Sequence, residues 1–298
     1  MLERESAPRD VRYSIVIPTC NRVDLLPRCL DAISVSLQGV DAAAFEIVVT
    51  DDSQGDETHG LLAERYPSIH RVRGPRHGPA ANRNAGVACT RGRWIIFTDD
   101  DCVPEADWLR EYVKAFERQP DSRVFEGKTV ADRQRLRFDE DSPVNTDGGY
   151  LWSCNMAIQR DLFDRLGGFC EAFPYPAMED VDFRLRLNAC GEKFSFVPEA
   201  VVCHPFRPTK GISFIVKSGE SYLHLVNRHP YLIRDHRWVD FALNSARRAR
   251  IVLRAGYAYR LRGFPYGLLW LAVLTYFDFR SRIRPHPPSP DARLSPGS

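Results

Sequence analysis

Apolar segments of strand length alternate with helical segments over the first third of the chain. Residues 13–18, 45–50 and 93–98 are rich in Ile, Val and Phe, and residues 69–74 form a shorter candidate strand. The segments between them carry apolar residues at mixed three and four spacing, which is typical of helices. Strands that are apolar throughout are buried on both faces, and helical crossovers join parallel strands. The pattern predicts an α/β fold with a mostly parallel sheet flanked by helices.

Polar residues directly follow three of these strands. The sequence reads PTCNR after the first strand, DDS after the second and DDD after the last. Parallel strands end at one edge of a sheet, where α/β proteins bind their ligands. Adjacent aspartates repel one another unless a cation or hydrogen-bond donors hold them. A solvated turn with a helix cap explains one acidic loop, but two at the same edge favour a ligand-binding crevice.

Composition narrows the class of protein. The chain has 298 residues, of which 44% are hydrophobic and 27% charged, as in ordinary soluble globular proteins. A formal net charge of +2 gives no strong global field that would attract nucleic acid. The eight cysteines include no CxxC pair, so we expect a reducing cytoplasm rather than a disulfide framework. The charged residues 1–10 do not resemble a signal peptide and are expected to be flexible.

The C-terminal part is basic and contains the most apolar stretch of the protein. From Phe241 onward there are ten arginines and two acidic residues, and Gly263–Phe277 is an apolar run of 15 residues. A helix needs about 20 residues to span a bilayer. Arginine flanks with Trp and Tyr fit a helix lying in the membrane interface, and a core or oligomer helix is equally compatible. Residues 284–298 are rich in Pro and Ser, which predicts a disordered tail.

Short stretches of the chain, in this order, resemble a family 2 glycosyltransferase with the GT-A fold. The resemblance covers residues 11–206 and rests on SIVIPTCNR, EIVVTDDSQGDET, GPAANRNAG, WIIFTDDDCVPEADWL, CNMAIQRDLFDRLGGF, MEDVDFRLRL and VVCHP. It implies a Rossmann-like GT-A domain over residues 11–206, followed by a helical, basic and amphipathic extension over residues 207–283. We expect the charge-rich residues 118–146, which match no part of the family pattern, to form a flexible loop near the acceptor.

The resemblance also implies an activity and its partners. Family members transfer a sugar from a nucleoside diphosphate sugar to an acceptor hydroxyl, with inversion and with Mn²⁺ or Mg²⁺ as cofactor. We expect a UDP-sugar first, with GDP- or dTDP-sugars as alternatives, and a glycan or lipid-linked acceptor in cell-surface polysaccharide or glycolipid synthesis. We expect the protein to be cytoplasmic and to associate peripherally with the inner face of the cytoplasmic membrane. We expect no nucleic-acid partner.

Site residues can be carried over position by position. Asp180, in the ED pair, matches the catalytic base. The nucleotide-sugar-binding positions are Pro18, Thr19, Asn21, Asp52, Arg83, Asn84, Asp99 and Asp100. The acceptor-side positions are Trp152, Asn155 and Glu179. The metal positions are Asp101, Asp99 and His204.

The chemistry explains these residue types independently. Hard divalent cations bind carboxylate oxygens and substrate phosphates, and a cation stabilises the charge that develops on a departing diphosphate. One carboxylate on the opposite side of the sugar then suffices as base. Asp180 begins a candidate helix, whose dipole should keep it ionised.

Simpler explanations for the same residues remain open. Asp180 could cap its helix or pair with Arg184 one turn on. Plain structural roles are also open for Asp52 in a turn, Arg83 on a helix surface, Trp152 in the core and His204 at a strand end. The usual DDGS turn of the family reads Asp51-Asp52-Ser53-Gln54 here, which leaves the geometry of the base pocket undefined.

Other functions fit the sequence less well. A metal-dependent sugar nucleotidyltransferase would carry a glycine-rich phosphate loop after its first strand, and IPTCNRVD has no glycine. A receiver-like signalling domain is much shorter than this chain. A catalytically inactive nucleotide-sugar-binding protein would not need both Asp101 and Asp180.

Overall fold

The computed structural model describes residues 11–173, 175, 177–209, 211–234 and 238–283. The chain divides into two compact units. The sheet unit comprises Met1–Asp132, Pro143–Glu171 and Glu179–Pro205, and the helical unit comprises Arg133–Ser142, Ala172–Met178 and Phe206–Ser298. The helical unit thus includes two segments that lie within residues 11–206 of the sequence. The proposed flexible N-terminus, 1–10, and tail, 284–298, lie outside the described residues.

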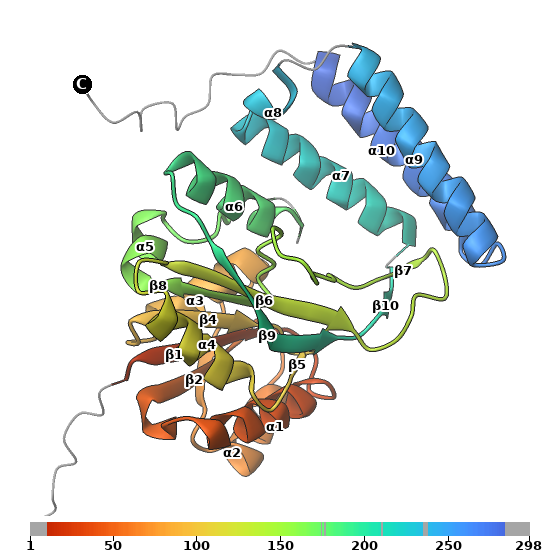
Figure 1. The fold of residues 1–298 in the computed structure, drawn as a ribbon. Helices are drawn as coiled ribbons and strands as arrows, with labels where there is room; N and C mark the ends of the chain where they lie inside the picture. The colour runs from red at the N-terminus through yellow and green to blue at the C-terminus, as the bar shows by residue number, and fades with distance from the viewer. Residues whose placement is uncertain (1–10, 174, 176, 210, 235–237, 284–298) are drawn as a thin grey trace, which may run out of the picture. The chain divides into compact units, whose positions relative to one another are not determined.

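The sheet unit is built on one eight-stranded mixed sheet in the order β3-β2-β1-β4-β8-β6-β9-β5 (Figure 1). The strands are β1 (Tyr13–Thr19), β2 (Phe45–Asp51), β3 (His70–Arg73), β4 (Trp94–Thr98), β5 (Val103–Pro104), β6 (Val124–Ala131), β8 (Asn155–Gln159) and β9 (Ser195–His204). Strands β3, β2, β1 and β4 are parallel, as the sequence predicts, whereas β8 pairs antiparallel with both β4 and β6. The parallel half carries the strand ends with polar residues.

Helices cover both faces of this sheet. One hydrophobic cluster joins it to α1 (Leu26–Ser36), α2 (Glu57–Arg65) and α4 (Trp108–Arg118). The other joins it to α3 (Pro79–Ala88), α5 (Arg160–Arg165) and α6 (Glu179–Ala189). Along β4, Ile96 belongs to the first cluster and Ile95 and Phe97 to the second. Both faces of the strand are therefore buried, which is why its sequence is apolar throughout.

Close packing of α3 on the sheet requires a glycine. A Cβ atom at Gly86 would collide with Thr50 Oγ1 on β2 and with Val16 Cγ1 on β1. Only a residue without a side chain lets the helix approach this closely. The approach brings the polar residues of α3 against the ends of β1 and β2.

Two sequence predictions beyond the parallel strands are wrong. The segment 194–205 contains one strand, β9 (Ser195–His204), instead of two. Its pairing with β6 shifts register between Gly127 and Lys128, whose partners are Val197 and Val201. The extra residues include Pro198, which cannot donate a ladder hydrogen bond and is accommodated in this irregularity. The predicted flexible loop over residues 118–146 contains β6, which lies between β8 and β9 in the sheet.

The helical unit consists of a short sheet and four helices. Its strands are β7 (Glu140–Asp141) and β10 (Arg207–Pro208), and its helices are α7 (Gly211–Arg228), α8 (Tyr231–Arg234), α9 (Trp238–Ala258) and α10 (Phe264–Ile283). Helix α10 packs against α7 and α9, and α9 and α10 run as a hairpin (Figure 1). Among the described helices, none combines the length and the apolar character that crossing a bilayer demands.

Candidate active site

The three consecutive aspartates at the end of β4 are each held by a different set of contacts. Asp100 is buried and accepts hydrogen bonds from Thr19 Oγ1 at 2.7 Å and from Arg22 Nη1 at 2.7 Å. The same Arg22 nitrogen lies 3.2 Å from Asp101 Oδ2. Burial raises the pKa of Asp100, and the Arg22 charge opposes that rise. One arginine thus relieves the repulsion between two neighbouring carboxylates.

Asp101 faces His204, the last residue of β9. Asp101 Oδ1 lies 3.5 Å from His204 Nε2, and both side chains are buried. His204 Nδ1 lies 2.9 Å from the carbonyl oxygen of Pro205 and must donate to it, because a carbonyl only accepts. In the neutral imidazole, Nε2 then presents its lone pair toward the Asp101 carboxylate. Two acceptors that face each other suit a cation or a proton between them.

Asp101, His204 and Cys102 form the group with metal-ligand character in the described part of the chain, because their ligand atoms all lie within 4.8 Å of one another. Burial raises the pKa of the Cys102 thiol well above its usual value. A thiol kept protonated is a poor metal ligand, so Asp101 and His204 are the better candidates. Asp99, the other predicted metal ligand, does not belong to this group.

Asp99 instead pairs with Arg83, which reaches it from α3. Arg83 is 4% exposed, so it is no surface arginine. Its Nη2 donates to Asp99 Oδ1 at 2.6 Å, and its Nη1 donates to Glu179 Oε1 at 3.4 Å. The planar guanidinium thereby connects the aspartates of β4 with the first residue of α6. Two site residues that are distant in the sequence are held at one edge of the sheet.

Asp180 follows Glu179 in the first turn of α6. Its Oδ1 accepts the backbone N–H of Val181 at 2.8 Å. Burial, together with the neighbouring Glu179 carboxylate, raises the pKa of Asp180 to about 7. The helix dipole was expected to keep this group ionised, but desolvation and like charge outweigh the dipole and favour the ionised form less than in an ordinary aspartate. Arg184 does not pair with Asp180 and donates instead to the carbonyl oxygens of Gly149 and Tyr150.

The loop after β2 is ordered by its two aspartates in different ways. Asp51 is fully buried and accepts from Ser53 N at 2.9 Å and from Arg71 Nη2 at 3.1 Å. Asp52 is half-buried and accepts from Arg76 N at 2.9 Å. Burial raises the pKa of Asp52. Asp51 therefore shapes the turn, and Asp52 keeps carboxylate surface for a ligand.

The predicted residues at the end of β1 differ in what they can offer a ligand. Pro18 is buried in the strand, and the Thr19 hydroxyl is committed to Asp100. Asn21 is exposed with φ 54°, a left-handed conformation that Asn tolerates. Its backbone N–H donates to Ser53 Oγ at 2.7 Å, which ties the loop after β1 to the loop after β2.

Asn84 is held by contacts of its own. Its side chain donates to Phe169 O and Glu171 Oε1, both at 2.8 Å, and accepts from Phe169 N at 2.9 Å. It therefore fastens the loop after α5 to α3. Donor binding by Asn84 stays a prediction.

Asn155 does not have the predicted acceptor-side role. Its side chain is 1% exposed and accepts from Trp108 Nε1 at 2.9 Å and from Tyr112 Oη at 2.8 Å. Its amide nitrogen donates to the carbonyl oxygens of Lys128 and Ala200. Asn155 thus joins α4, β6 and β9 in the interior and has no surface for an acceptor. Trp152 stacks on Tyr150, with ring centroids 5.3 Å apart, and stays an acceptor-side candidate.

Sequence reasoning missed three residues that organise the site. Arg22 bridges two aspartates, as described above. Asn82 is buried and donates to the carbonyl oxygens of Thr19 at 3.2 Å and Thr50 at 3.0 Å, which locks the ends of β1 and β2 together. Glu126 binds the backbone of the loop that precedes β8. Arg22 and Asn82 lie within the family-like stretches PTCNR and GPAANRNAG, so their positions could have identified them as site residues. Glu126 lies outside all of these stretches.

Comparison with known proteins decides the family. The sequence profile of glycosyl transferase family 2 matches residues 14–167, more than half of the chain. The chain belongs to glycosyl transferase family 2. It is therefore a glycosyltransferase, as the order of its motifs indicates.

Similar proteins are also glycosyltransferases by name. Glycosyltransferase AglE of Haloferax volcanii is 24% identical over 218 residues, which cover 65% of this chain and 67% of that protein. A PGL/p-HBAD biosynthesis glycosyltransferase of Mycobacterium tuberculosis is 33% identical over 190 residues, covering 58% of this chain and 68% of that protein. A Haemophilus influenzae glycosyltransferase is matched over 61% of its length, so the chain spans less than two thirds of that relative.

Solved structures support the fold. A mannosyltransferase of Pyrobaculum calidifontis, determined with GDP-Man and Mn²⁺, superposes with a TM-score of 0.60 at 19% identity over 93% of this chain and 91% of that one. S. aureus TarS residues 1–349 in complex with UDP gives 0.53 at 16% identity, over 91% of each chain. The fold is GT-A, which confirms the fold implied by the sequence resemblance.

Proposed function

We propose that this glycosyltransferase moves a sugar from a nucleoside diphosphate sugar to an acceptor hydroxyl with inversion at the anomeric carbon. The observation that best supports the proposal is the linkage of Asp99 to Glu179 through the buried Arg83, because it joins the aspartates that follow β4 to the first turn of α6, in which Asp180 lies. The similar mannosyltransferase and TarS structures contain GDP-Man and UDP, respectively. These two ligands favour a nucleotide-sugar donor for this chain as well, with either uracil or guanine as its base.

Asp101 and His204 would hold a divalent cation against the donor diphosphate. A carboxylate oxygen and an imidazole nitrogen that face each other at 3.5 Å are a suitable pair of ligands for Mn²⁺, and Mn²⁺ accompanies GDP-Man in the similar mannosyltransferase. When bound, the cation supplies Lewis acidity to the departing diphosphate. Mg²⁺ would serve the same role.

The protein's own residues carry the remaining tasks. Asp52 accepts hydrogen bonds from the nucleotide base, and Arg83 fixes the orientation of Asp99 toward the ribose. Glu179, which accepts a hydrogen bond from Arg83, faces acceptor or donor hydroxyls. Asp180 removes the proton of the attacking hydroxyl on the side of the sugar opposite to the diphosphate. A pKa of about 7 suits this task, because a general base works best when its pKa is near the working pH.

A turnover assay tests the proposal. Wild-type protein is incubated with Mn²⁺ and, in turn, UDP-, GDP- and dTDP-sugars, and release of the nucleoside diphosphate is measured with and without a panel of octyl glycosides. The anomeric configuration of the product is then read by proton NMR. We expect release from one donor class and an inverted product. Release without metal, or a product of retained configuration, would contradict the proposed mechanism.

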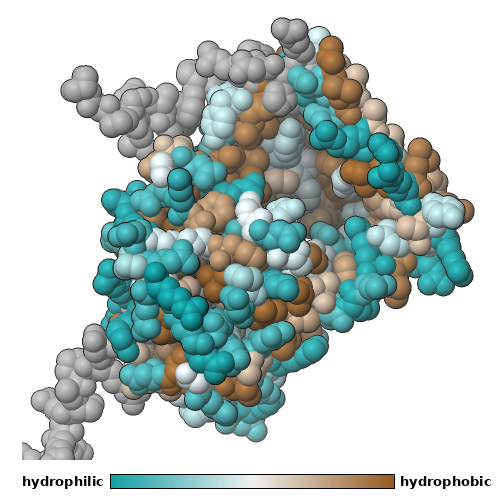
Figure 2. Space-filling model, viewed as in Figure 1, coloured by the Kyte–Doolittle hydropathy of each residue, from teal (hydrophilic) through white to brown (hydrophobic). Residues whose placement is uncertain are grey.

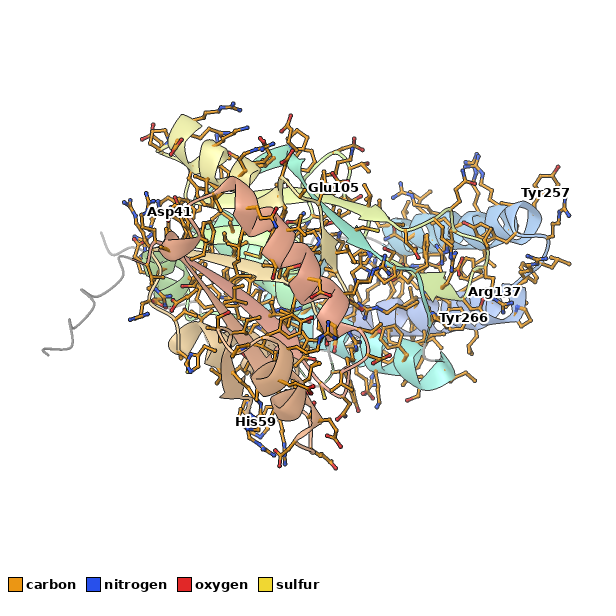
Figure 3. The ribbon with its side chains drawn as sticks, turned by 90° about the horizontal axis from the view of Figure 1, so that it is seen from below. Asp41, His59, Glu105, Arg137, Tyr257 and Tyr266 are labelled. Atoms are coloured by element: carbon orange, nitrogen blue, oxygen red, sulfur yellow. The ribbon has the colours of Figure 1, made fainter. Side chains whose placement is uncertain are left out.

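The helical unit has features of a peripheral membrane surface. Along α9, Val239, Leu243, Leu253 and Tyr257 recur at helical spacing on one face and are 61% to 92% exposed. Tyr257 lies at the end of the α9–α10 hairpin (Figure 3). Hydrophobic and hydrophilic residues lie side by side along these helices (Figure 2). An apolar stripe with amphipathic aromatic residues fits the interface between headgroups and acyl chains.

Charge favours an anionic lipid surface as its partner. Residues 238–283 contain eight arginines and two acidic residues. One of the two, Asp278, is buried between Arg248 and Arg282, so it does not offset the exposed arginines. Basic residues near an anionic bilayer contribute about 1 kcal/mol each. The protein would therefore lie on the membrane that carries a lipid-linked acceptor, in polysaccharide or glycolipid synthesis.

Co-sedimentation with vesicles separates this location from self-association. Wild-type protein should sediment with vesicles of phosphatidylcholine and phosphatidylglycerol and remain free with phosphatidylcholine alone. The double variant Leu243→Ser/Leu253→Ser should lose most of the binding. The alternative result is that wild type binds neither kind of vesicle and forms a concentration-dependent dimer in ultracentrifugation that the double variant loses. The apolar face of α9 would then be an interface between two copies of the chain.

A further inference from the structure

A glycine-rich loop enters the sheet beside the aspartates and carries two stacked aromatic rings. Strand β8 runs antiparallel to β4, and its first residue, Asn155, pairs with Thr98, the last residue of β4. The loop over residues 148–152 therefore reaches the sheet at the edge where Asp99–Asp101 leave it. Tyr150 is 47% exposed, and its ring lies on that of Trp152 with an interplanar angle of 23°.

The backbone of this loop is held in conformations that few residues adopt. Gly148, Gly149 and Leu151 have φ values of 82°, 99° and 52°. A leucine in the left-handed region costs about 1 kcal/mol or more and persists only where surrounding contacts impose it. Leu151 is fully buried in the core, which is one such contact. The loop is therefore built into a defined shape.

The buried carboxylate of Glu126 supplies the second constraint. It is 1% exposed and accepts the backbone N–H groups of Gly149, Tyr150 and Leu151, the last two at 3.2 and 2.7 Å. Consecutive N–H groups that converge on one site form an anion-binding nest. Here the anion is a side chain of β6, so the nest fixes the loop instead of binding a ligand.

Arg184 of α6 holds the opposite side of the same peptide groups. Its Nη1 donates to Gly149 O at 2.5 Å and to Tyr150 O at 3.4 Å. Arg184 lies four residues after Asp180, and residues at this spacing share one face of a helix. The helix that carries the proposed base thus also holds the loop that carries the aromatic rings.

We infer that Tyr150 and Trp152 form a platform for a pyranose ring of the acceptor, with Glu126 and Arg184 as positioning residues. The inference rests on the proposed glycosyltransferase reaction and names the acceptor class for its site. A pyranose ring has an apolar face of C–H groups and a rim of hydroxyls, which suits the exposed phenol ring of Tyr150 backed by the partly buried indole of Trp152. Arg184, one turn after Asp180 on α6, contacts the backbone of this loop, so the platform and the proposed base lie on neighbouring elements.

Saturation-transfer NMR with octyl glycosides of glucose, galactose, mannose and N-acetylglucosamine tests the platform directly. With UDP, GDP and dTDP supplied together with Mn²⁺, wild type should saturate the ring C–H protons of at least one glycoside. Tyr150→Phe, the matched control, should retain the signal, because it keeps the ring. Tyr150→Ala should raise the apparent dissociation constant of that glycoside roughly three- to ten-fold.

Glu126→Gln tests the positioning role. It keeps the size of the side chain and replaces one accepting oxygen by a donor, so the nest should loosen and glycoside binding weaken, while metal-dependent nucleotide binding stays within about two-fold of wild type. Arg184→Lys, which loses the extended fork, should act in the same direction. Because Glu126→Gln could fail to fold, the Tyr150 pair decides the question by itself.

The outcomes separate this inference from the proposed function. If wild type saturates no glycoside, or if Tyr150→Ala saturates it as wild type does, the platform is overturned whatever the donor results show. If nucleotides also fail to bind, the proposed function falls as well. Intact nucleotide binding with an unaffected Tyr150→Ala overturns only the platform.

Discussion

His204 Nε2 lies 3.5 Å from Asp101 Oδ1, although one residue ends β9 and the other follows β4. His204 Nδ1 is fixed by the carbonyl of Pro205, and Asp101 Oδ2 lies 3.2 Å from Arg22. The two groups are thus oriented toward each other by contacts that a bound ligand need not disturb. Such preorganised ligands with supported orientation are typical of metal sites.

Replacing either member of this pair should weaken metal-dependent nucleotide binding. We expect Asp101→Asn and His204→Gln each to lower the affinity for nucleoside diphosphate with Mn²⁺ by about 10- to 100-fold, the range typical of lost metal-site contacts. Cys102→Ser is the matched control and should bind as wild type does, because its thiol is not a ligand in this account. Equal loss in all three variants, measured by calorimetry, would indicate general damage to the loop.

Asp180→Asn should abolish transfer and leave donor binding nearly intact. An amide cannot accept the proton of the acceptor hydroxyl, and loss of a general base lowers the rate by about 10²- to 10⁴-fold. Asp182→Asn, on the same helix, is the contrasting variant. Asp182 is fully buried and accepts from Arg186 Nε at 2.8 Å, so its change should lower the melting temperature and spare kcat. If Asp180→Asn loses nucleotide binding too, its role is structural.

The pH dependence of the reaction should report Asp180. Its ionised form is the proposed base, and its pKa in the folded protein is raised to about 7 by burial and by Glu179. Therefore kcat/KM should rise with pH through about 7 and level off above it, with a single proton lost. A rate that stays constant as the pH falls from about 8 to about 5 would mean that a group with an ordinary carboxyl pKa is the base.

Arg83→Lys should impair the site more than a conservative change suggests. The guanidinium contacts Asp99 and Glu179 at once, and an ammonium group cannot reproduce this fork. Truncating a partner of a buried charge pair costs about 2–5 kcal/mol, so we expect a fall in kcat/KM of at least about 30-fold. Arg76→Lys, which retains its backbone contact with Asp52, is the control. Near-normal kinetics for Arg83→Lys would remove this residue from the account.

The stability of the helical unit should depend on its buried acidic residue, Asp278. Asp278 is 1% exposed and accepts from Arg248 Nη1 at 3.0 Å and from Arg282 Nε at 3.1 Å. Asp278→Ala leaves buried positive charge unbalanced, which destabilises by about 3–5 kcal/mol. The exposed Arg254→Gln on α9 should change stability by less than about 0.5 kcal/mol. Thermal unfolding followed by circular dichroism distinguishes the two, and equal melting temperatures would contradict the prediction.

The parallel half of the sheet was predictable because its signals are local. Each of β1, β2 and β4 reads as an apolar run in which both faces are buried, and Asp99–Asp101 follow β4 directly in the sequence. Strand β6, which is antiparallel to β8 and parallel to β9, was not predictable in the same way. Its segment mixes Glu126 and Lys128 with apolar residues, and its place in the sheet depends on pairing with β8 and β9.

Within the site, the sequence predicted which types of residue are present, but it did not predict how deeply each one is buried or what it contacts. Asn155 was expected on the acceptor side because of its place in the family pattern, yet four hydrogen bonds satisfy its side chain in the interior. Asp180 looked ionised because only the helix dipole was visible in the sequence, whereas burial depends on the packing of distant segments. Glu126 carried no signal at all, since its function arises from backbone groups more than twenty positions away.

The measurement that tests the central claim most directly is calorimetric titration of the 298-residue chain with UDP, GDP and dTDP, each with and without Mn²⁺. We expect that one of the three binds in the presence of Mn²⁺, that removing the metal abolishes most of the heat, and that Asp101→Asn does the same. If none of the three nucleotides binds, or if binding is unchanged both without Mn²⁺ and in Asp101→Asn, the proposed metal-dependent donor site is contradicted.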